Sequence, residues 1–167
     1  MGSALMLHIV VFNVVLIAVV AFAVWGGGAP ERIVAGLMFV ANAATALLPY
    51  DPGSTFLWLD WSGFGVDALL FVAFTAVALR ADRYWPIWLA ALQLVAVAIH
   101  LVRIVDRALV PLVYAWSIGQ IAYPLMALLV AGTVRHRQRL RDFGDDPSWS
   151  GETRCTDGAG RPADPLV

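Results

Sequence analysis

Asp67 has the strongest case for chemistry in this chain, because it is the one charged residue in the apolar stretch from Trp61 to Leu79. An acid at the centre of a lipid bilayer costs about 2.5 to 3.5 kcal/mol on insertion scales, so such residues are rare and often functional. We therefore expect Asp67 to be either protonated or hydrated. A proton or small-solute conductor centred on Asp67 is one hypothesis, and a structural hydrogen bond is the alternative.

Polar residues that could meet Asp67 recur at helical spacing farther along the chain. Gln93, His100 and Arg103 fall on one helical face, and Asp60 lies two turns before Asp67. In an antiparallel hairpin that turns near residue 82, equal depth pairs Asp67 with Gln93 and Asp60 with Arg103. We predict a polar contact near the middle of the membrane and an ion pair nearer its surface. No cationic residue of the second helix is expected at the depth of Asp67.

Two histidines suggest a cofactor-binding alternative. His8 and His100 would both lie in the outer half of the membrane, as the axial ligands of one b-type haem require. Arg103, one turn after His100, could then pair with a haem propionate. A histidine held by a neighbouring side chain is the simpler interpretation, and apart from this haem we expect no cofactor.

Uncharged polar residues form two further groups. A first hairpin that turns near residue 28 sets Asn13 close in depth to Asn42 and Thr45. Gln120 lies near Pro124, whose missing N–H leaves a backbone carbonyl free. Asparagine and glutamine in membrane helices most often hold helices together, so a structural role is the simpler expectation for these residues.

Recognised catalytic motifs are missing from the sequence. It has no HExxH, GxSxG or CxxC motif and no phosphate-binding loop. It contains no lysine, which excludes a Schiff base, and its single cysteine, Cys155, cannot form an internal disulfide. We expect no metal site. The sequence favours a non-enzymatic protein, although residues from different helices could still converge on an active site.

The elements that must position these residues follow from composition. Apolar residues make up 60% of the 167 and charged residues 14%, and the charges collect in short connections and the tail. A soluble chain of this length cannot bury so much apolar surface, so lipid must surround it. A helix of about 20 residues crosses a bilayer. We therefore predict an all-α, polytopic bundle of about five transmembrane helices: Ala4–Trp25, Ile33–Tyr50, Leu57–Leu79, Trp85–Val105 and Leu109–Thr133.

Arginines indicate how the bundle is oriented. With five spans, Arg32, the pair Arg80 and Arg83, and an arginine cluster after the fifth span all lie on one side. The positive-inside rule makes that side the cytoplasm and places the N-terminus outside. Aromatic residues suited to the cytoplasmic interface are Trp25, Tyr84, Trp85 and Trp88.

The chain divides into a transmembrane bundle over 1–133 and a cytoplasmic segment over 134–167. Four arginines should extend the fifth span by a helical turn and contact anionic lipid headgroups rather than nucleic acid. They are Arg135, Arg137, Arg139 and Arg141. From Asp142 onward Gly, Pro, Ser, Thr and Asp predominate, which predicts a disordered tail.

Small size, many alanines and glycines for close helix packing, and sparse chemistry favour a supporting role. We expect a small accessory or scaffold subunit of the cell's inner (plasma) membrane. It would pack against a larger membrane-protein partner or against copies of itself. An electron carrier that holds haem b through His8 and His100, and a conductor centred on Asp67, are the alternatives.

Overall fold

Five helices account for nearly all regular secondary structure in the part of the chain that the computed structural model describes. That part comprises residues 2–47, 61–81, 83–105, 111–144, 146, 148 and 149, and side chains are described for all of these except 2–5, 103–105 and 111–119. Besides helices it holds one isolated antiparallel β-bridge, between Ala81 and Trp149. The helices are α1 (Gly2–Gly26), α2 (Ala29–Leu47), α4 (Trp61–Arg80), α5 (Trp85–Val105) and α6 (Pro111–Phe143).

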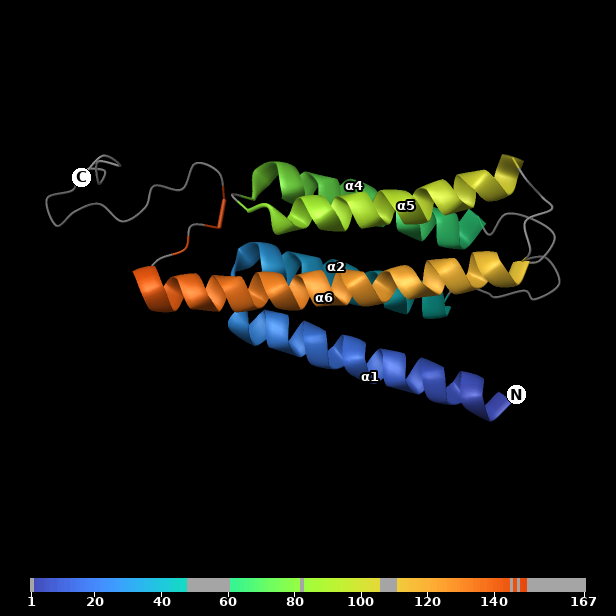
Figure 1. The fold of residues 1–167 in the computed structure, drawn as a ribbon, viewed down its shortest axis with the longest axis horizontal. Helices are drawn as coiled ribbons and strands as arrows, with labels where there is room; N and C mark the ends of the chain where they lie inside the picture. The colour runs from blue at the N-terminus through green and yellow to red at the C-terminus, as the bar shows by residue number, and fades with distance from the viewer. Residues whose placement is uncertain are drawn as a thin grey trace, which may run out of the picture.

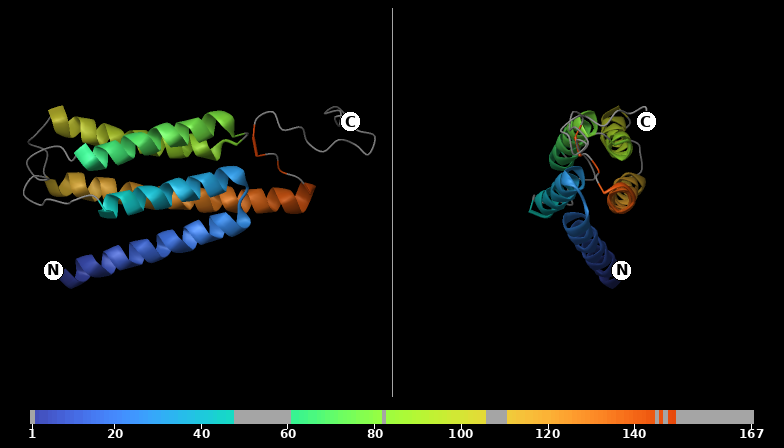
Figure 2. Two further views of the ribbon diagram at one scale, coloured as in Figure 1. Left: turned by 180° about the vertical axis from the view of Figure 1, so that it is seen from behind. Right: turned by 90° about the vertical axis from the view of Figure 1, so that its left-hand side faces the viewer.

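The helices pack as a closed ring. Each described helix contacts the next one in chain order, α6 returns to contact α1, and α2 also touches α6 across the ring. Figure 1 shows them side by side, with α1 inclined away from α6 toward its N-terminus, and Figure 2 shows the same bundle from behind and end-on. The start of α1 and the end of α6 lie at opposite ends of the bundle (Figure 1).

The end of the bundle at which α2 begins is defined by a cap. The backbone N–H of Gly28 donates to Oε2 of Glu31 at 3.0 Å, and Pro30 lies in the first turn. A carboxylate three residues after the cap satisfies a donor that the helix leaves free, and it also interacts favourably with the helix dipole. This cap explains why α2 begins at Ala29, four residues before the predicted Ile33.

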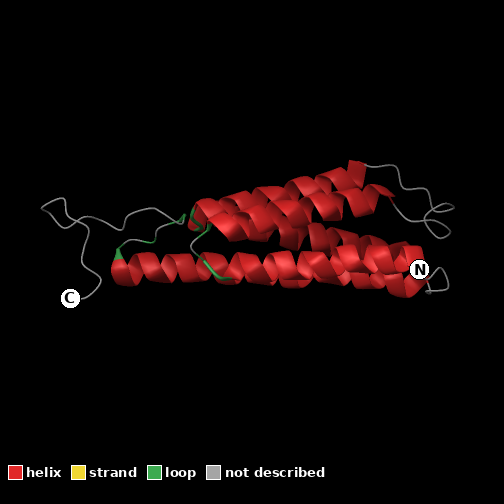
Figure 3. Cartoon of the chain, turned by 90° about the horizontal axis from the view of Figure 1, so that it is seen from above, coloured by secondary structure: helices red, strands yellow, loops and turns green. Residues whose placement is uncertain are grey.

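The last helix continues well beyond the predicted fifth span. α6 passes through Pro124 without ending and reaches Phe143, so it includes the arginine-rich turn. The predicted helical extension of the fifth span is therefore confirmed. Figure 3 shows this helix projecting past the others at the end where the chain leaves the bundle.

Three helical segments are long and apolar enough to cross a membrane. Their outward faces expose large apolar side chains such as Ile17, Leu69 and Val72. Such surfaces are unfavourable in water and favourable in lipid, which indicates a membrane protein. The segments are Met6–Gly26, Trp61–Arg80 and Trp85–Val102.

A layer of fully buried apolar side chains crosses the bundle near the α2 start. We call it the apolar layer; it consists of Val34, Phe74, Leu89 and Leu129, each 0% exposed and each from a different helix. All four belong to one cluster of buried apolar side chains, and on each helix they lie between the charged end and the polar residues farther along. The layer separates the polar groups at this end of the bundle from those farther along.

Trp85 differs from the interfacial role predicted for it. Trp25, Tyr84 and Trp88 are largely exposed near the same end of the bundle, as expected for residues at a membrane interface. Trp85 instead is buried, because its indole packs against α6 at Gly132, where a Cβ atom would lie 2.7 Å from Cε2 of the indole.

Candidate functional site

Asp67 lies at the centre of a compact group of polar side chains, which we call the polar cluster: Asp67, Gln93 and His100. Nε2 of Gln93 donates to Oδ1 of Asp67 at 2.8 Å and approaches its backbone carbonyl at 3.3 Å. Nε2 of His100 lies 2.9 Å from Oδ2 of Asp67. Gln93 and His100 are 1% and 2% exposed, whereas the Asp67 side chain is 20% exposed.

The α4–α5 hairpin explains the cluster. The predicted pairing of Asp67 with Gln93 at equal depth is confirmed. His100 also contacts Asp67, a pairing that the sequence reasoning did not assign. Gln93 and His100 lie two helical turns apart on the same face of α5. A turn near residue 82 sets Asp67 level with a point between them, so each lies about one helical turn (~5 Å) from Asp67 in depth and reaches it with its side chain. The ring of Phe64 packs edge-on against the imidazole, with centroids 5.8 Å apart.

The chemistry of the polar cluster follows from its donors and acceptors. With Asp67 ionised, the imidazole donates from Nε2 and the amide of Gln93 donates to the other carboxylate oxygen. These two donors replace part of the hydration that an isolated acid would lose in the membrane. Each carboxylate oxygen can accept two hydrogen bonds, so Asp67 retains acceptor capacity on its exposed side.

An open cavity of about 450 Å³ lies beside Asp67, between the helices of the ring. All five helices contribute to its wall, which is mostly apolar and includes Leu16, Met38 and Leu125. Its polar lining residues are His8, Asn13, Asn42, Thr45, Asp67 and Gln93. A closed ring with one inclined helix leaves this space because α1 contacts α2 and α6 but not α4 or α5 within the described part of the chain.

The asparagine pair predicted for the first hairpin is present. Nδ2 of Asn42 donates to Oδ1 of Asn13 at 3.1 Å, and Nδ2 of Asn13 donates to the carbonyl of Ile9 at 2.8 Å. Thr45, expected at the same depth, donates to Ala41 within its own helix and lines the cavity. The pair fastens α1 to α2 at the cavity wall.

The two candidate haem ligands have different surroundings. His8 is exposed, lines the cavity and packs near the ring of Tyr123, with centroids 6.2 Å apart. His100 is buried and holds Asp67 with Nε2. No group of three or more possible metal ligands occurs among the residues described.

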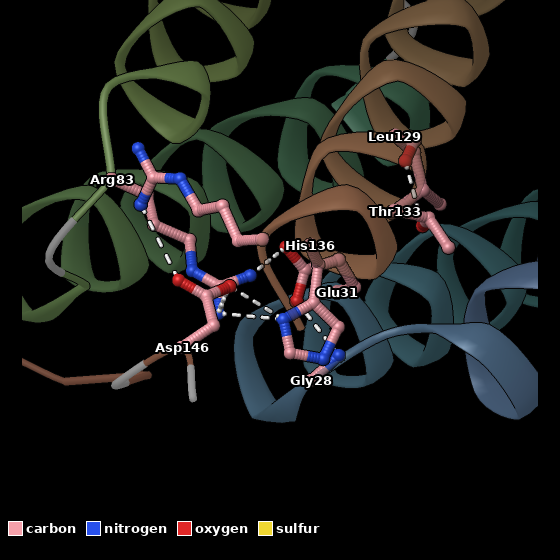
Figure 4. A network of polar contacts seen from close by, with 8 residues as sticks. Gly28, Glu31, Arg83, Leu129, Thr133, His136 and Asp146 are labelled. Carbon is pink, nitrogen blue, oxygen red and sulfur yellow. Dashed lines mark hydrogen bonds and ion pairs between the residues drawn. The ribbon is translucent and has the colours of Figure 1, made fainter. Parts of the chain in front are cut away.

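A second group of polar side chains lies beyond the apolar layer, at the α2 start (Figure 4). We call it the charge cluster: Glu31, Arg83, His136 and Asp146. Arg83 forms a salt bridge with Glu31 through Nη1 and with Oδ2 of Asp146, 2.7 Å from Nη2. Nδ1 of His136 lies 2.6 Å from the same oxygen of Asp146. Arg139 adds a longer contact, 3.3 Å from Oδ1 of Asp146.

The charge cluster is buried and its acids are paired. The side chains of Glu31, Arg83 and Asp146 are 0%, 5% and 3% exposed. Buried charges persist only when paired and hydrogen-bonded, and here each carboxylate has a cationic partner. The cluster joins the start of α2, the α4–α5 connection, α6 and the segment after α6, so it ties four parts of the chain together.

Sequence reasoning missed the charge cluster. It placed Arg83 and the arginines after the fifth span on one side of the membrane but assigned no partners to Arg83. The usable signal is Glu31 beside Gly28, since an acid at a capping position on the arginine-rich side is a natural partner for Arg83. Asp146 was not considered as a partner because it lies in the segment from Asp142 onward that was predicted to be disordered. In fact Asp142 and Phe143 complete α6, and Asp146 is buried.

The remaining predicted residues belong to neither cluster, although Arg139 contacts the charge cluster. Asp60 and the side chain of Arg103 lie outside the described residues, as does most of the predicted disordered tail. Gln120 is half-buried on α6, away from the lining of the cavity. Arg137 packs over the ring of Phe22 at 5.5 Å, and Arg139 joins Asp146. Arg135 and Arg141 are exposed at the same end.

Comparisons with family models, with curated proteins and with solved structures found no match to this chain.

Proposed function

We propose that this protein crosses the cell's inner membrane with all five helices, its N-terminus outside and its C-terminus in the cytoplasm. The proposal is supported by three helices of sufficient length and apolarity and by two more that pack beside them in the same ring. It is also supported by the arginines at the end where α2 begins, including Arg32, Arg80 and Arg135. On this view the polar cluster extends from near the middle of the membrane, at Asp67 and Gln93, into its outer half at His100, and the charge cluster lies at the cytoplasmic interface.

Within that frame, we propose that the bundle binds a small, mostly apolar molecule that carries one hydrogen-bonding or cationic group. The single observation that carries this proposal is the 450 Å³ cavity that all five helices line beside Asp67. Binding sites for small molecules are typically concave, of about 300 to 1,000 Å³, largely apolar, and provided with a few convergent polar groups.

Asp67 would anchor such a ligand. Among the described residues of the lining it is the one acid, its two described partners hold it in place, and part of its side chain is exposed. Asn13 and Asn42 face the same space and offer further hydrogen bonds. A binding role of this kind is compatible with an accessory subunit without catalysis of its own, packed against a larger partner.

Ligand binding is tested by extraction of the purified full-length protein with organic solvent, followed by mass spectrometry. We expect a small molecule that accompanies the wild-type protein and the Asp142→Asn variant, whose acid is exposed on α6, but not Asp67→Asn. Ala96→Phe should also lose it by filling the cavity, because Ala96 is buried in the cavity wall. Equal recovery from all four proteins would contradict the proposal.

Proton conduction centred on Asp67 is the second candidate. The observation in its favour is the carboxylate–imidazole contact between Asp67 and His100, two groups that exchange protons readily. The apolar layer stands against a continuous path, since its four side chains are fully buried between the two clusters. Proteoliposome proton flux that is unchanged in Asp67→Asn would exclude this candidate.

Haem binding by His8 and His100 receives less support. Nε2 of His100, which an iron would need, is occupied by Asp67. An absorbance spectrum of the purified protein without a Soret band would exclude it.

The accessory-subunit hypothesis has its own test. Extraction in mild detergent and mass spectrometry of co-purifying proteins should recover a larger membrane protein in constant proportion to this chain. Recovery of the chain alone, as a monomer, would contradict both the larger partner and the homo-oligomer.

A further inference from the structure

A small pocket beside the charge cluster has the chemistry of an anion site. It has a volume of about 30 Å³ and lies where the start of α5 meets α6. Its described walls include Arg83, Trp85, Arg135, His136 and Arg139, and Asp146 is the one acidic residue among the described residues that line it. From this geometry we propose that the pocket binds an oxygen of a phosphate group, at a site separate from the cavity beside Asp67.

Two buried donors point to this ligand. The Nε–H of Arg83 and the Nε1–H of Trp85 are buried, and neither has a hydrogen-bond partner among the residues that the structure describes. Both side chains line the pocket. A buried donor without an acceptor is costly, so an acceptor inside the pocket that both side chains line is favoured.

The charges around the pocket favour an anion over a neutral acceptor. Three arginines line it, against one described carboxylate, Asp146, which already pairs with Arg83 and Arg139. A phosphate oxygen is an acceptor that also carries negative charge. Arg135 and Arg139 add positive charge at the more exposed side of the pocket, and the N-terminal end of α5 adds the favourable end of a helix dipole.

The position of the pocket favours a lipid headgroup as the source of the phosphate. Trp25, Tyr84 and Trp88 are exposed near this end of the bundle, as side chains at the level of headgroups are. A lipid phosphate would lie at this depth, and its remaining atoms would stay outside the small pocket. Free phosphate offers the same oxygens and is the other source.

Titration of the detergent-solubilised full-length protein, followed by native mass spectrometry, tests the proposal. The probes are inorganic phosphate alone, a short-chain phosphatidylglycerol and a short-chain phosphatidylcholine. We expect one molecule of a phosphate-bearing probe to bind, and Trp85→Phe and Arg135→Gln each to weaken it about tenfold, the equivalent of one hydrogen bond to a charged group. If only the lipids bind, the site takes a lipid headgroup. If inorganic phosphate also binds, and Trp85→Phe and Arg135→Gln weaken its binding as much as they weaken lipid binding, the site takes free phosphate.

Two matched controls separate a built site from general attraction to positive charge. Trp88→Phe makes the same change at an exposed tryptophan, and Arg141→Gln removes an exposed arginine of the same helix outside the pocket. Both should bind within about twofold of wild type. An effect of Arg141→Gln as large as that of Arg135→Gln would overturn the proposal, as would the absence of one-to-one binding. If Trp85→Phe lowers the melting temperature of the protein without ligand, the comparison of Arg135→Gln with Arg141→Gln, both at exposed positions, decides the outcome.

Discussion

The polar cluster and the charge cluster both place a carboxylate against a histidine, yet they differ in what surrounds it. Asp146 is buried among Arg83, His136 and Arg139, so cationic groups compensate its charge from several sides. Asp67 has one histidine and one amide, and its exposed side faces a 450 Å³ cavity. The first arrangement holds parts of the chain together, and the second leaves an acid available to a ligand.

The apolar layer keeps the two clusters distinct. Val34, Phe74, Leu89 and Leu129 are fully buried between them and carry no polar side-chain atoms. Changes at one cluster should therefore leave the other intact, because substitutions at separated sites without shared partners are usually additive. The following predictions test whether the two clusters differ in role as their surroundings indicate.

The largest effect is expected in the charge cluster. Arg83→Met should lower the free energy of unfolding by about 3 to 5 kcal/mol, because it leaves Glu31 and Asp146 buried without their shared cation. Unfolding by sodium dodecyl sulfate in mixed micelles measures this. Arg141→Met, at an exposed position of α6, should change stability by less than about 0.5 kcal/mol. If Arg83→Met and Arg141→Met lowered the free energy of unfolding equally, the buried ion pairs of Arg83 would contribute no more to stability than an exposed arginine does.

An intermediate effect is expected where α5 packs on α6. Gly132→Ala should destabilise the protein by about 1 to 3 kcal/mol, because the new Cβ would lie 2.7 Å from the rigid indole of Trp85. The same substitution at Gly65, on α4 near Asp67, meets nothing within 4 Å and should be neutral or slightly stabilising. Thermal unfolding in detergent compares the two. A loss at Gly65 matching that at Gly132 would mean that the region near the cavity is packed as tightly as the charge-cluster end.

The smallest effect is expected in the polar cluster. Gln93→Leu should cost about 1 kcal/mol, the usual value of a hydrogen bond between membrane helices, although Gln93 is almost fully buried. A double-mutant cycle with Asp67→Asn measures the coupling of the two side chains. A coupling of several kcal/mol would make the polar cluster a structural element like the charge cluster and would weaken the case for ligand binding.

Contacts within a hairpin were accessible from the sequence. Turn positions near residues 28 and 82 give the relative depth of two consecutive helices, and this placed Asn13 by Asn42 and Gln93 by Asp67 correctly. The same reasoning did not pair His100 with Asp67, because His100 lies about one helical turn away in depth and only its side chain closes the distance. The predicted pair of Asp60 and Arg103 lies outside the described residues and stays a prediction.

Contacts between helices distant in the chain were not accessible in this way. Hydropathy gives the position of a residue along the membrane normal, but it does not say which helices are neighbours or which faces they turn toward each other. The charge cluster needs α6 beside the α4–α5 connection and the start of α2, and the cavity needs α1 to close the ring against α6.

The sequence by itself predicted apolar helices of membrane-spanning length and the relative depth of polar residues within a hairpin, because bilayer thickness and transfer energy act on local composition. The tertiary structure alone decided that Glu31, Arg83, His136 and Asp146 share one buried site, and that a cavity opens beside Asp67. Both depend on how five helices are rotated and ordered around one ring. That arrangement is set by packing among all of them at once, which no single segment encodes.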